Sequence, residues 1–163
     1  MSSDVTFRDA VVPADVERVR AIVASTGFFS PDEIAIAAEL VGEALAQGDA
    51  SGYRFVLADV GGRTLAYACY GAIPATEGSF DLYWIAVSAE ARGMGLGRRV
   101  LAEAERRIAA LGGRRIWVET SSRAQYAPTR AFYERCGYER AALLEDFYRP
   151  GDGKVVYVKE PST

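Results

Sequence analysis

The sequence predicts one α/β domain in which a mixed β-sheet carries helices on both faces. The 163 residues are 50% apolar and 25% charged, which is typical of one compact domain with its own core. Glycine-rich turns between β-forming segments predict antiparallel hairpins, and a strand–helix–strand succession later in the chain predicts a parallel pair. The predicted domain spans residues 5–160.

The first part of the chain is expected to contribute a strand, two helices and a hairpin. Apolar residues at helical spacing predict the first helix, and the second begins with Ser30-Pro31-Asp32-Glu33, the pattern of a capped helix N-terminus. Two glycines between β-forming segments predict the hairpin turn. The expected elements are a strand at 5–8, helices at 13–27 and 31–47, and strands at 53–59 and 64–70.

The second part is expected to place a helix between two parallel strands and to end with a hairpin. The strand at 80–87 is almost continuously apolar, and the helix after it has one apolar stripe, so both should be well buried. The expected elements are strands at 80–87 and 115–120, helices at 97–111 and 128–136, and strands at 139–147 and 155–159 around the turn 149–154.

The charge distribution excludes several classes of function. Because the chain has no histidine, Ser-His or Cys-His catalysis and histidine metal sites are excluded, and we predict no metal. The net charge of −3 argues against a nucleic-acid partner. Residues 1–60 carry a net charge of −6 and residues 88–115 one of +4. The basic stretch indicates a local anion site, unless it is only a solvated helix face.

The sequence also gives an expectation of location. No segment approaches the roughly 20 consecutive apolar residues that span a bilayer, and the first residues do not resemble a signal peptide. Cys69 and Cys136 fit a reduced chain better than a disulfide scaffold. We therefore expect a cytoplasmic protein that has no membrane partner.

The most informative segment is Arg92-Gly93-Met94-Gly95-Leu96-Gly97-Arg98-Arg99, between a buried strand and a helix. Alternating glycines let backbone N–H groups converge, and the helix N-terminus adds partial positive charge, so the turn can hold a pyrophosphate. The spacing does not fit a dinucleotide fold, and no Gly-Lys-Ser/Thr sequence follows as in a P-loop. The alternative is that the glycines serve only a tight turn.

These residues resemble the GCN5-related N-acetyltransferases, the GNAT family. The family's coenzyme A motif is matched by Arg92, Gly95 and Gly97, and a second family element by Phe132-Tyr133 with Gly137-Tyr138. The resemblance implies a mostly antiparallel sheet in which the parallel strand pair splays apart. It further implies that acetyl-CoA is the cosubstrate and that its pantetheine arm lies between the splayed strands.

The resemblance also implies roles for individual residues. Main-chain groups of Ile85, Ala86 and Val87 would contact the pantetheine and thioester, and the segment from Arg92 through Gly93, Met94, Gly95, Leu96 and Gly97 to Arg98 would hold the pyrophosphate. Tyr133 matches the general acid that protonates the leaving thiolate, although it could simply pack on the coenzyme. Seven residues earlier, where many relatives have an asparagine that contacts the coenzyme arm, this chain has Tyr126, which we include in the cofactor site.

The general base remains open between two carboxylates. Asp81 lies where some protein-acetylating relatives carry a catalytic glutamate, and Glu119 lies on the neighbouring strand. Either could accept the amine proton directly or through water. The alternatives are that both only face solvent, and that ordered water with a backbone carbonyl takes the proton.

The acceptor is expected to be a small primary amine or amino acid, bound by segments 28–34, 73–79 and 146–154. Phe28, Phe29, Glu77 and Tyr83 are the candidate contacts. The hairpin near the C-terminus resembles that of ribosomal-protein N-terminal acetyltransferases, so a peptide N-terminus is the alternative acceptor. A non-catalytic acyl-CoA sensor is the alternative of another class, and the fold is compatible with a homodimer.

Overall fold

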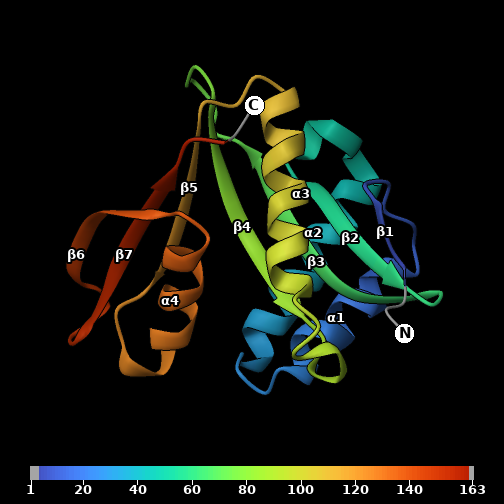
Figure 1. The fold of residues 1–163 in the computed structure, drawn as a ribbon, viewed down its shortest axis with the longest axis horizontal. Coiled ribbons are helices and arrows are strands. Elements are labelled where there is room, and N and C mark those ends of the chain that lie inside the picture. The colour runs from blue at the N-terminus through green and yellow to red at the C-terminus, as the bar shows by residue number, and fades with distance from the viewer. Residues whose placement is uncertain (1–3, 162–163) are drawn as a thin grey trace.

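The described residues form one seven-stranded sheet in the order β1-β2-β3-β4-β5-β7-β6 (Figure 1). The computed structural model describes residues 4–161. All neighbouring strands are antiparallel except β4 and β5, which are parallel. The strands are β1 (Val5–Arg8), β2 (Arg54–Val60), β3 (Arg63–Ala72), β4 (Ser79–Val87), β5 (Arg115–Ser121), β6 (Glu139–Arg149) and β7 (Asp152–Lys159). The predicted mixed sheet is confirmed.

Helices cover both faces of this sheet, as the sequence predicts. One hydrophobic cluster joins α3 and α4 to one face, and the other joins α1 and α2 to the opposite face. Figure 1 shows α3 in front of the central strands and α1 and α2 behind them. The helices are α1 (Asp15–Ser25), α2 (Pro31–Gln47), α3 (Leu96–Ala110) and α4 (Ala127–Arg135). None of the helices within residues 4–161 is both long and apolar enough to cross a membrane.

Helix α2 begins where its capping residues predict. The Ser30 side chain accepts a hydrogen bond from the Glu33 N–H, and the Glu33 carboxylate accepts one from the Ser30 N–H. This reciprocal pair satisfies two N–H groups at the start of the helix. The helix then ends at Gln47 before Gly48, as expected.

A fully buried carboxylate ties the start of α1 to the sheet edge. Both Asp15 oxygens accept hydrogen bonds from Arg8 at 2.7 Å, and Arg8 also binds Asp59 on β2. Burial alone would raise the pKa of Asp15, but hydrogen bonds from Arg8, the Val12 N–H and Arg18 outweigh burial and lower it to about 2. Asp15 therefore stays ionised, and its network fixes how α1 leaves β1.

The last hairpin differs from the sequence prediction. The expected turn at 149–154 is too long, because β6 runs to Arg149 and β7 begins at Asp152. The Gly153 N–H donates to the Ser122 hydroxyl, and Asp152 is bound by Ser121. These contacts with the end of β5 hold residues 152 and 153 in the sheet, so the turn is reduced to Pro150 and Gly151.

The parallel pair separates partway along its length, which creates an opening within the sheet. The pairing of β4 with β5 ends at Leu82 opposite Val118, although β4 continues to Val87 and β5 to Ser121. Each strand keeps its outer partner, β3 or β7, beyond that point. The backbone groups on the two inner edges are therefore available to a ligand. This is the splay that the family resemblance implies.

Candidate functional site

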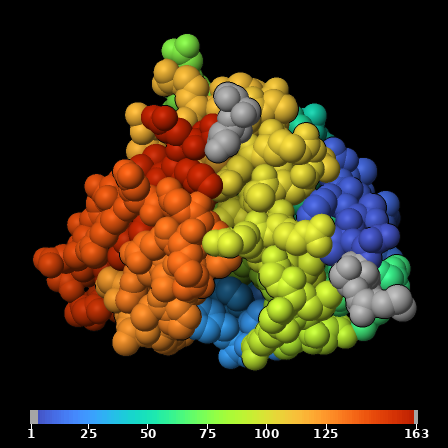
Figure 2. Space-filling view, in the orientation of Figure 1, coloured from blue at the N-terminus to red at the C-terminus, as the bar shows by residue number. Residues whose placement is uncertain are grey.

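The opening between β4 and β5 is the floor of a pocket of about 800 Å³. Its walls come from the α1–α2 loop, β4, the start of α3, β5, α4 and the β6–β7 hairpin. Figure 2 shows the surface hollowed between the atoms of α4 and those of the segment before α3. Segments far apart in the sequence thus converge where the strands part.

The glycine-rich turn leaves the N-terminus of α3 open to a ligand. Gly93 and Gly95 have φ angles of 84° and 72°, a left-handed conformation that glycine adopts without strain. Gly95 is the N-cap, and no side chain caps the helix. The first N–H groups of α3 are therefore left for an anion, which the helix dipole also favours.

Arg92 connects this turn to the end of α1. Its guanidinium donates to the Thr26 carbonyl at 3.2 Å, and the Ala89 N–H donates to the Ser25 hydroxyl at 3.0 Å. Arg92 and Gly97 both line the pocket. A Cβ at Gly97 would lie 3.5 Å from Phe132 and from Val87, an ordinary van der Waals distance, so packing alone does not require a glycine at this position.

A β-bulge in β4 lies at the point where the strands part. Cys69 on β3 pairs with Trp84 and Tyr70 with Leu82, so Tyr83 has no partner on β3. A bulge disrupts the ladder and re-aims backbone groups next to many active sites. Here it adds unpaired backbone groups beside the free inner edge of β4.

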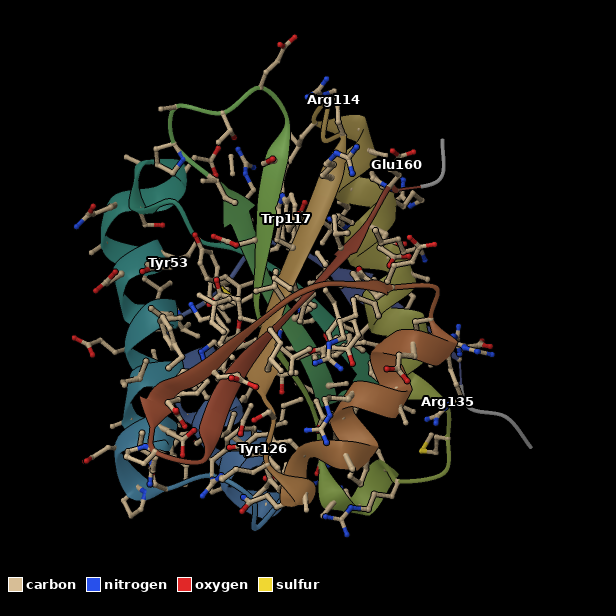
Figure 3. The ribbon with its side chains drawn as sticks, turned by 90° about the vertical axis from the view of Figure 1, so that its left-hand side faces the viewer. Tyr53, Arg114, Trp117, Tyr126, Arg135 and Glu160 are labelled. Atoms are coloured by element: carbon tan, nitrogen blue, oxygen red, sulfur yellow. The ribbon has the colours of Figure 1, made fainter. Side chains whose placement is uncertain are left out.

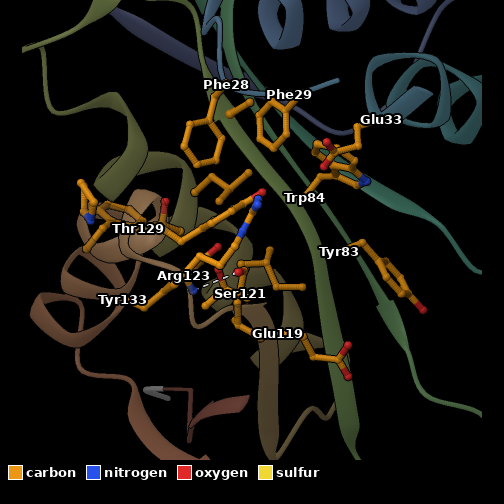
Figure 4. A pocket seen from close by; sticks show the side chains of 18 of the residues that line it. Phe28, Phe29, Glu33, Tyr83, Trp84, Glu119, Ser121, Arg123, Thr129 and Tyr133 are labelled. Carbon is orange, nitrogen blue, oxygen red and sulfur yellow. Dashed lines mark hydrogen bonds between the residues drawn. The ribbon is translucent and has the colours of Figure 1, made fainter. Parts of the chain in front are cut away.

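Tyr133 on α4 forms part of the pocket wall that faces the aromatic residues of β4 and the α1–α2 loop. Figure 4 shows Tyr133 and Thr129 on the α4 side, with Phe28, Phe29 and Trp84 across the pocket. The Tyr133 ring is buried, and burial raises the pKa of its phenol well above the usual range. The phenol therefore remains protonated at neutral pH.

A chain of aromatic contacts crosses the pocket. Trp84 on β4 contacts Phe29 with ring centroids 5.0 Å apart, Phe29 contacts Phe28 at 5.3 Å, and Phe28 contacts Tyr126 at 4.7 Å. Tyr126 lies immediately before α4, at the lower end of that helix in Figure 3. The α1–α2 loop therefore reaches across the gap between the two halves of the sheet.

Two carboxylates lie where the strands begin to separate. Asp81 is paired in register with Trp117, two residues before Glu119 on β5. Burial raises the pKa of Asp81, the charge of Glu119 raises it further, and Lys154 opposes both. Lys154 forms an ion pair with Glu119 at 3.0 Å. The ion pair with Lys154 engages Glu119, whereas Asp81 has no ion-pair partner within residues 4–161.

The pocket brings together eleven of the residues that the sequence singles out, namely Phe28, Phe29, Tyr83, Ile85, Ala86, Val87, Arg92, Gly97, Glu119, Tyr126 and Tyr133. Gly93, Met94, Gly95, Leu96 and Arg98 belong to the turn and helix start beside it, where Leu96 is buried in the core and Met94 is exposed. Asp81 does not line the pocket, although its neighbour Leu82 does. Glu77 is not part of the pocket.

Glu77 lies in the β3–β4 loop, before the first residue of β4. Its carbonyl accepts a hydrogen bond from Arg114, in the loop that leads into β5. This is the closed end of the parallel pair, where Ser79 is opposite Arg115, and the pocket begins only at Leu82. We therefore leave Glu77 out of the acceptor site that the structure supports.

The pocket residues that sequence reasoning does not single out include Trp84, Arg123, Arg149 and Asp152. In the sequence, Trp84 cannot be distinguished from the other apolar residues of a buried strand. Asp152 and Arg149 sit in a segment with an ordinary turn signal, and Arg123 lies about thirty residues away in the sequence. The covering segment 146–154 was expected to contact the acceptor, but no local pattern marks which of its side chains do so.

No group of three or more Asp, Glu or Cys residues that could hold a metal ion occurs within the described part of the chain. The pocket therefore gives no basis for assigning a metal to it. Its chemical resources are backbone N–H groups, a buried phenol, carboxylates and arginines.

Comparison with known proteins connects this site with one family. The family model described as the acetyltransferase (GNAT) family matches residues 23–138. A candidate acetyltransferase of the GNAT family from Desulfovibrio desulfuricans is 50% identical, with a TM-score of 0.95 over 98% of this chain and 100% of that one. A comparison with curated protein sequences gives no match.

More distant solved structures share the fold. The ribosomal-protein-S18-alanine N-acetyltransferase from Escherichia coli is 20% identical, with a TM-score of 0.74 over 98% of this chain and 96% of that one. An aminoglycoside 6′-N-acetyltransferase complexed with coenzyme A is 15% identical, with a TM-score of 0.76 over 98% of each chain. Their acceptors differ, so the fold alone does not specify one.

Proposed function

The chain belongs to the GNAT family of acetyltransferases, and from this membership we propose that it transfers acetyl from acetyl-CoA directly to the primary amine of a small molecule or amino acid. The observation that carries the proposal is the opening between β4 and β5, which leads directly to the uncapped N-terminus of α3. An extended chain that ends in a pyrophosphate matches both features.

The residues present fit acetyl-CoA at two places. The unpaired inner edge of β4 at Ile85, Ala86 and Val87 offers backbone N–H and C=O groups to the amides of the pantetheine arm. The segment from Arg92 to Arg98 offers a guanidinium, an open helix N-terminus and first-turn N–H groups to the pyrophosphate. When bound, acetyl-CoA supplies an acyl thioester.

Tyr133 and the two carboxylates would move the protons of the transfer. Asp81, directly or through water, or Glu119 would accept a proton from the acceptor ammonium, because only a neutral amine attacks a thioester carbonyl. Backbone N–H groups near the Tyr83 bulge would polarise that carbonyl. As the carbon–sulfur bond breaks, Tyr133 would give its proton to the departing thiolate.

The aromatic wall on the acceptor side favours a small acceptor over a protein chain. Phe28, Phe29 and Trp84 form one wall, and the Phe28–Tyr126 contact closes the gap next to it. A peptide N-terminus remains the alternative acceptor. A non-catalytic sensor would have no use for the Tyr133 phenol.

Calorimetric titration with acetyl-CoA tests the proposal. We expect saturable binding of acetyl-CoA and none of NAD or ATP at the same concentrations, because the turn lacks the features of a dinucleotide fold or P-loop. An assay of thiol release with a panel of amines then reports turnover. Absence of acetyl-CoA binding would refute the cofactor assignment.

A further inference from the structure

Two arginines in the pocket share a single buried carboxylate. Asp152 is only 3% exposed, and one of its oxygens accepts a hydrogen bond from the Ser121 hydroxyl. The other oxygen lies 3.4 Å from Nε of Arg123 and 3.8 Å from Nε of Arg149. Asp152 therefore holds the two guanidinium groups side by side on the acceptor side of the pocket.

This cluster carries one uncompensated positive charge. Arg123 and Arg149 line the pocket, and Nε of Arg123 is buried without a hydrogen bond to any residue in 4–161. Within the same range, neither guanidinium donates a hydrogen bond through its terminal nitrogens. An arginine whose terminal nitrogens are open presents a flat fork that matches a carboxylate.

The opposite charge lies a short distance along β5. Asp81 and Glu119 share the single cation Lys154, which leaves one negative charge near the point where the strands part. Positions 119 and 121 are on the same face of β5, about 7 Å apart. Ser121 binds the Asp152 carboxylate that holds the arginines, so an α-amino acid can place its ammonium group at Glu119 and its carboxylate at the Arg123–Arg149 pair.

The wall near these charges is apolar and aromatic. Phe28, Phe29 and Trp84 are in mutual contact and line the same pocket. A side chain that projects from the Cα of a bound amino acid would meet these rings. Burial of such a side chain favours apolar residues over charged ones.

We propose that the acceptor is an α-amino acid with an apolar side chain, whose carboxylate is bound by Arg123 and Arg149. This inference rests on the proposed function, because it names the acceptor of the same reaction. The ammonium loses one proton to Asp81 or Glu119, and the neutral nitrogen bonds to the acetyl carbon. As the carbon–sulfur bond breaks, Tyr133 protonates the thiolate, the coenzyme leaves as its thiol, and the second nitrogen proton returns to Tyr133. The product keeps the carboxylate but loses the ammonium charge, so its electrostatic attraction to Asp81 and Glu119 weakens.

The charge pattern disfavours the other amine classes. A peptide N-terminus has an amide where a free amino acid has its carboxylate, so it cannot satisfy the arginine pair. A polyamine would place a second cation against the same arginines, which would repel it. The carboxylate is thus the group to vary in a test.

Calorimetry on the protein saturated with coenzyme A tests the proposal. The probes are L-leucine, L-phenylalanine and L-methionine, each compared with its amide. We expect at least one acid to bind at least about tenfold more tightly than its amide, because a guanidinium–carboxylate hydrogen bond is lost. Arg123→Gln and Arg149→Gln should each weaken binding of that acid about tenfold or more and leave the amide unaffected.

Matched variants separate recognition from folding. Arg135→Gln makes the same change on the outer side of α4, where Figure 3 shows Arg135 pointing away from the sheet, and should not alter binding. Arg123→Lys and Arg149→Lys keep the charge and should recover part of the affinity. Far-UV circular dichroism confirms that each variant is folded.

The possible failures are distinguishable. If acetyl-CoA does not bind to the unmodified protein, the proposed function is wrong. If acetyl-CoA binds but each acid binds no better than its amide, or no acid binds, only the amino-acid inference is overturned. If acid binding survives in both glutamine variants, the arginine pair is not the carboxylate site.

Discussion

A buried phenol can act in catalysis or only in packing, and Tyr133 has the surroundings of a catalytic group. It lines the pocket, and burial raises its pKa, so it is held in the protonated form. Tyr138, five residues later, is equally buried but donates a hydrogen bond from its hydroxyl to Glu105, outside the pocket. Substitution of Tyr138 can therefore serve as the control for substitution of Tyr133.

Replacement of Tyr133 by phenylalanine is expected to lower kcat about 100-fold, because it removes the proton donor while it keeps the ring. The affinity for acetyl-CoA, measured by titration, should stay within about threefold of the original. Tyr138→Phe removes the same atom outside the site and should leave kcat unchanged. Equal losses of kcat in both variants would mean that the hydroxyl of Tyr133 acts only in folding.

Asp15 gives a pH-dependent contribution to stability. Its pKa in the folded protein, about 2, lies below the ordinary value of about 3.9 in an unfolded chain. The carboxylate therefore stabilises the fold fully above about pH 5, and this contribution is lost as the pH falls toward 2. Asp15→Asn should lower the free energy of unfolding at pH 7 by roughly 3 kcal/mol.

Denaturant unfolding at several pH values checks this expectation. Between pH 5 and pH 2, the free energy of unfolding should fall less steeply in Asp15→Asn than in the unmodified protein. Glu17→Gln removes an exposed carboxylate on the same helix and should change stability by less than about 0.5 kcal/mol. If the free energy of unfolding falls with pH equally in Asp15→Asn and in the unmodified protein, Asp15 does not contribute this pH-dependent stability.

At the scale of elements, the sequence predicts best those boundaries that local chemistry sets. The bounds of α2 follow from its capping residues, and α3 lies within one residue of the expectation because glycines flank it. The last hairpin was less predictable because contacts of Ser121 and Ser122 with residues 152 and 153 lengthen β7. Those contacts join segments about thirty residues apart, which no local pattern records.

The same distinction applies to the candidate site. The glycine-rich turn and Tyr133 lie in contiguous motifs, so both can be singled out in the sequence, the turn by its glycine spacing and Tyr133 by the family resemblance. The pairing of Arg123 and Arg149 on Asp152 depends on β5 and β7 being neighbours in the sheet. Glu77 shows the same limit, because its place in the sequence does not reveal that its loop lies at the closed end of the strand pair, outside the pocket.

Two glycines show how the surrounding residues determine the effect of a glycine-to-alanine substitution on stability. A Cβ at Gly113, in the turn between α3 and β5, would collide with the Ile108 side chain and lie 2.9 Å from the Ile108 carbonyl. Gly42, inside α2, has open space at that position. Gly113→Ala should therefore destabilise the protein by about 2 kcal/mol, whereas Gly42→Ala should stabilise it by up to about 1 kcal/mol.

Thermal or denaturant unfolding of the two variants measures this contrast. The opposite signs are the important result, since a general sensitivity to alanine would lower both stabilities. A neutral or stabilising effect at Gly113 would mean that the turn relaxes easily and does not fix the packing of α3 on β4 and β5.

At the scale of the whole molecule, the proposed cofactor site joins parts that have few other connections across the opening. Beyond Leu82 and Val118, β4 and β5 are not hydrogen-bonded to each other. Acetyl-CoA at about 100 times its dissociation constant should stabilise the folded state by about 2.7 kcal/mol. For a chain of this size, Tm should rise by about 5–10 °C.

Differential scanning calorimetry with and without acetyl-CoA tests this expectation. NAD at the same concentration serves as the control and should leave Tm unchanged. A shift with acetyl-CoA of less than 1 °C at concentrations that saturate the titration would contradict a binding mode restricted to the folded state.

The separation of β4 and β5 also has a consequence for solubility. A sheet that opens in its middle exposes strand edges of the kind at which proteins recruit foreign strands and aggregate. Here the edges lie at the bottom of a pocket, and the contact between Phe28 and Tyr126 lies across the gap above them. The unpaired edges therefore line a pocket instead of the outer rim of the sheet, so another chain must enter that pocket before it can pair with them.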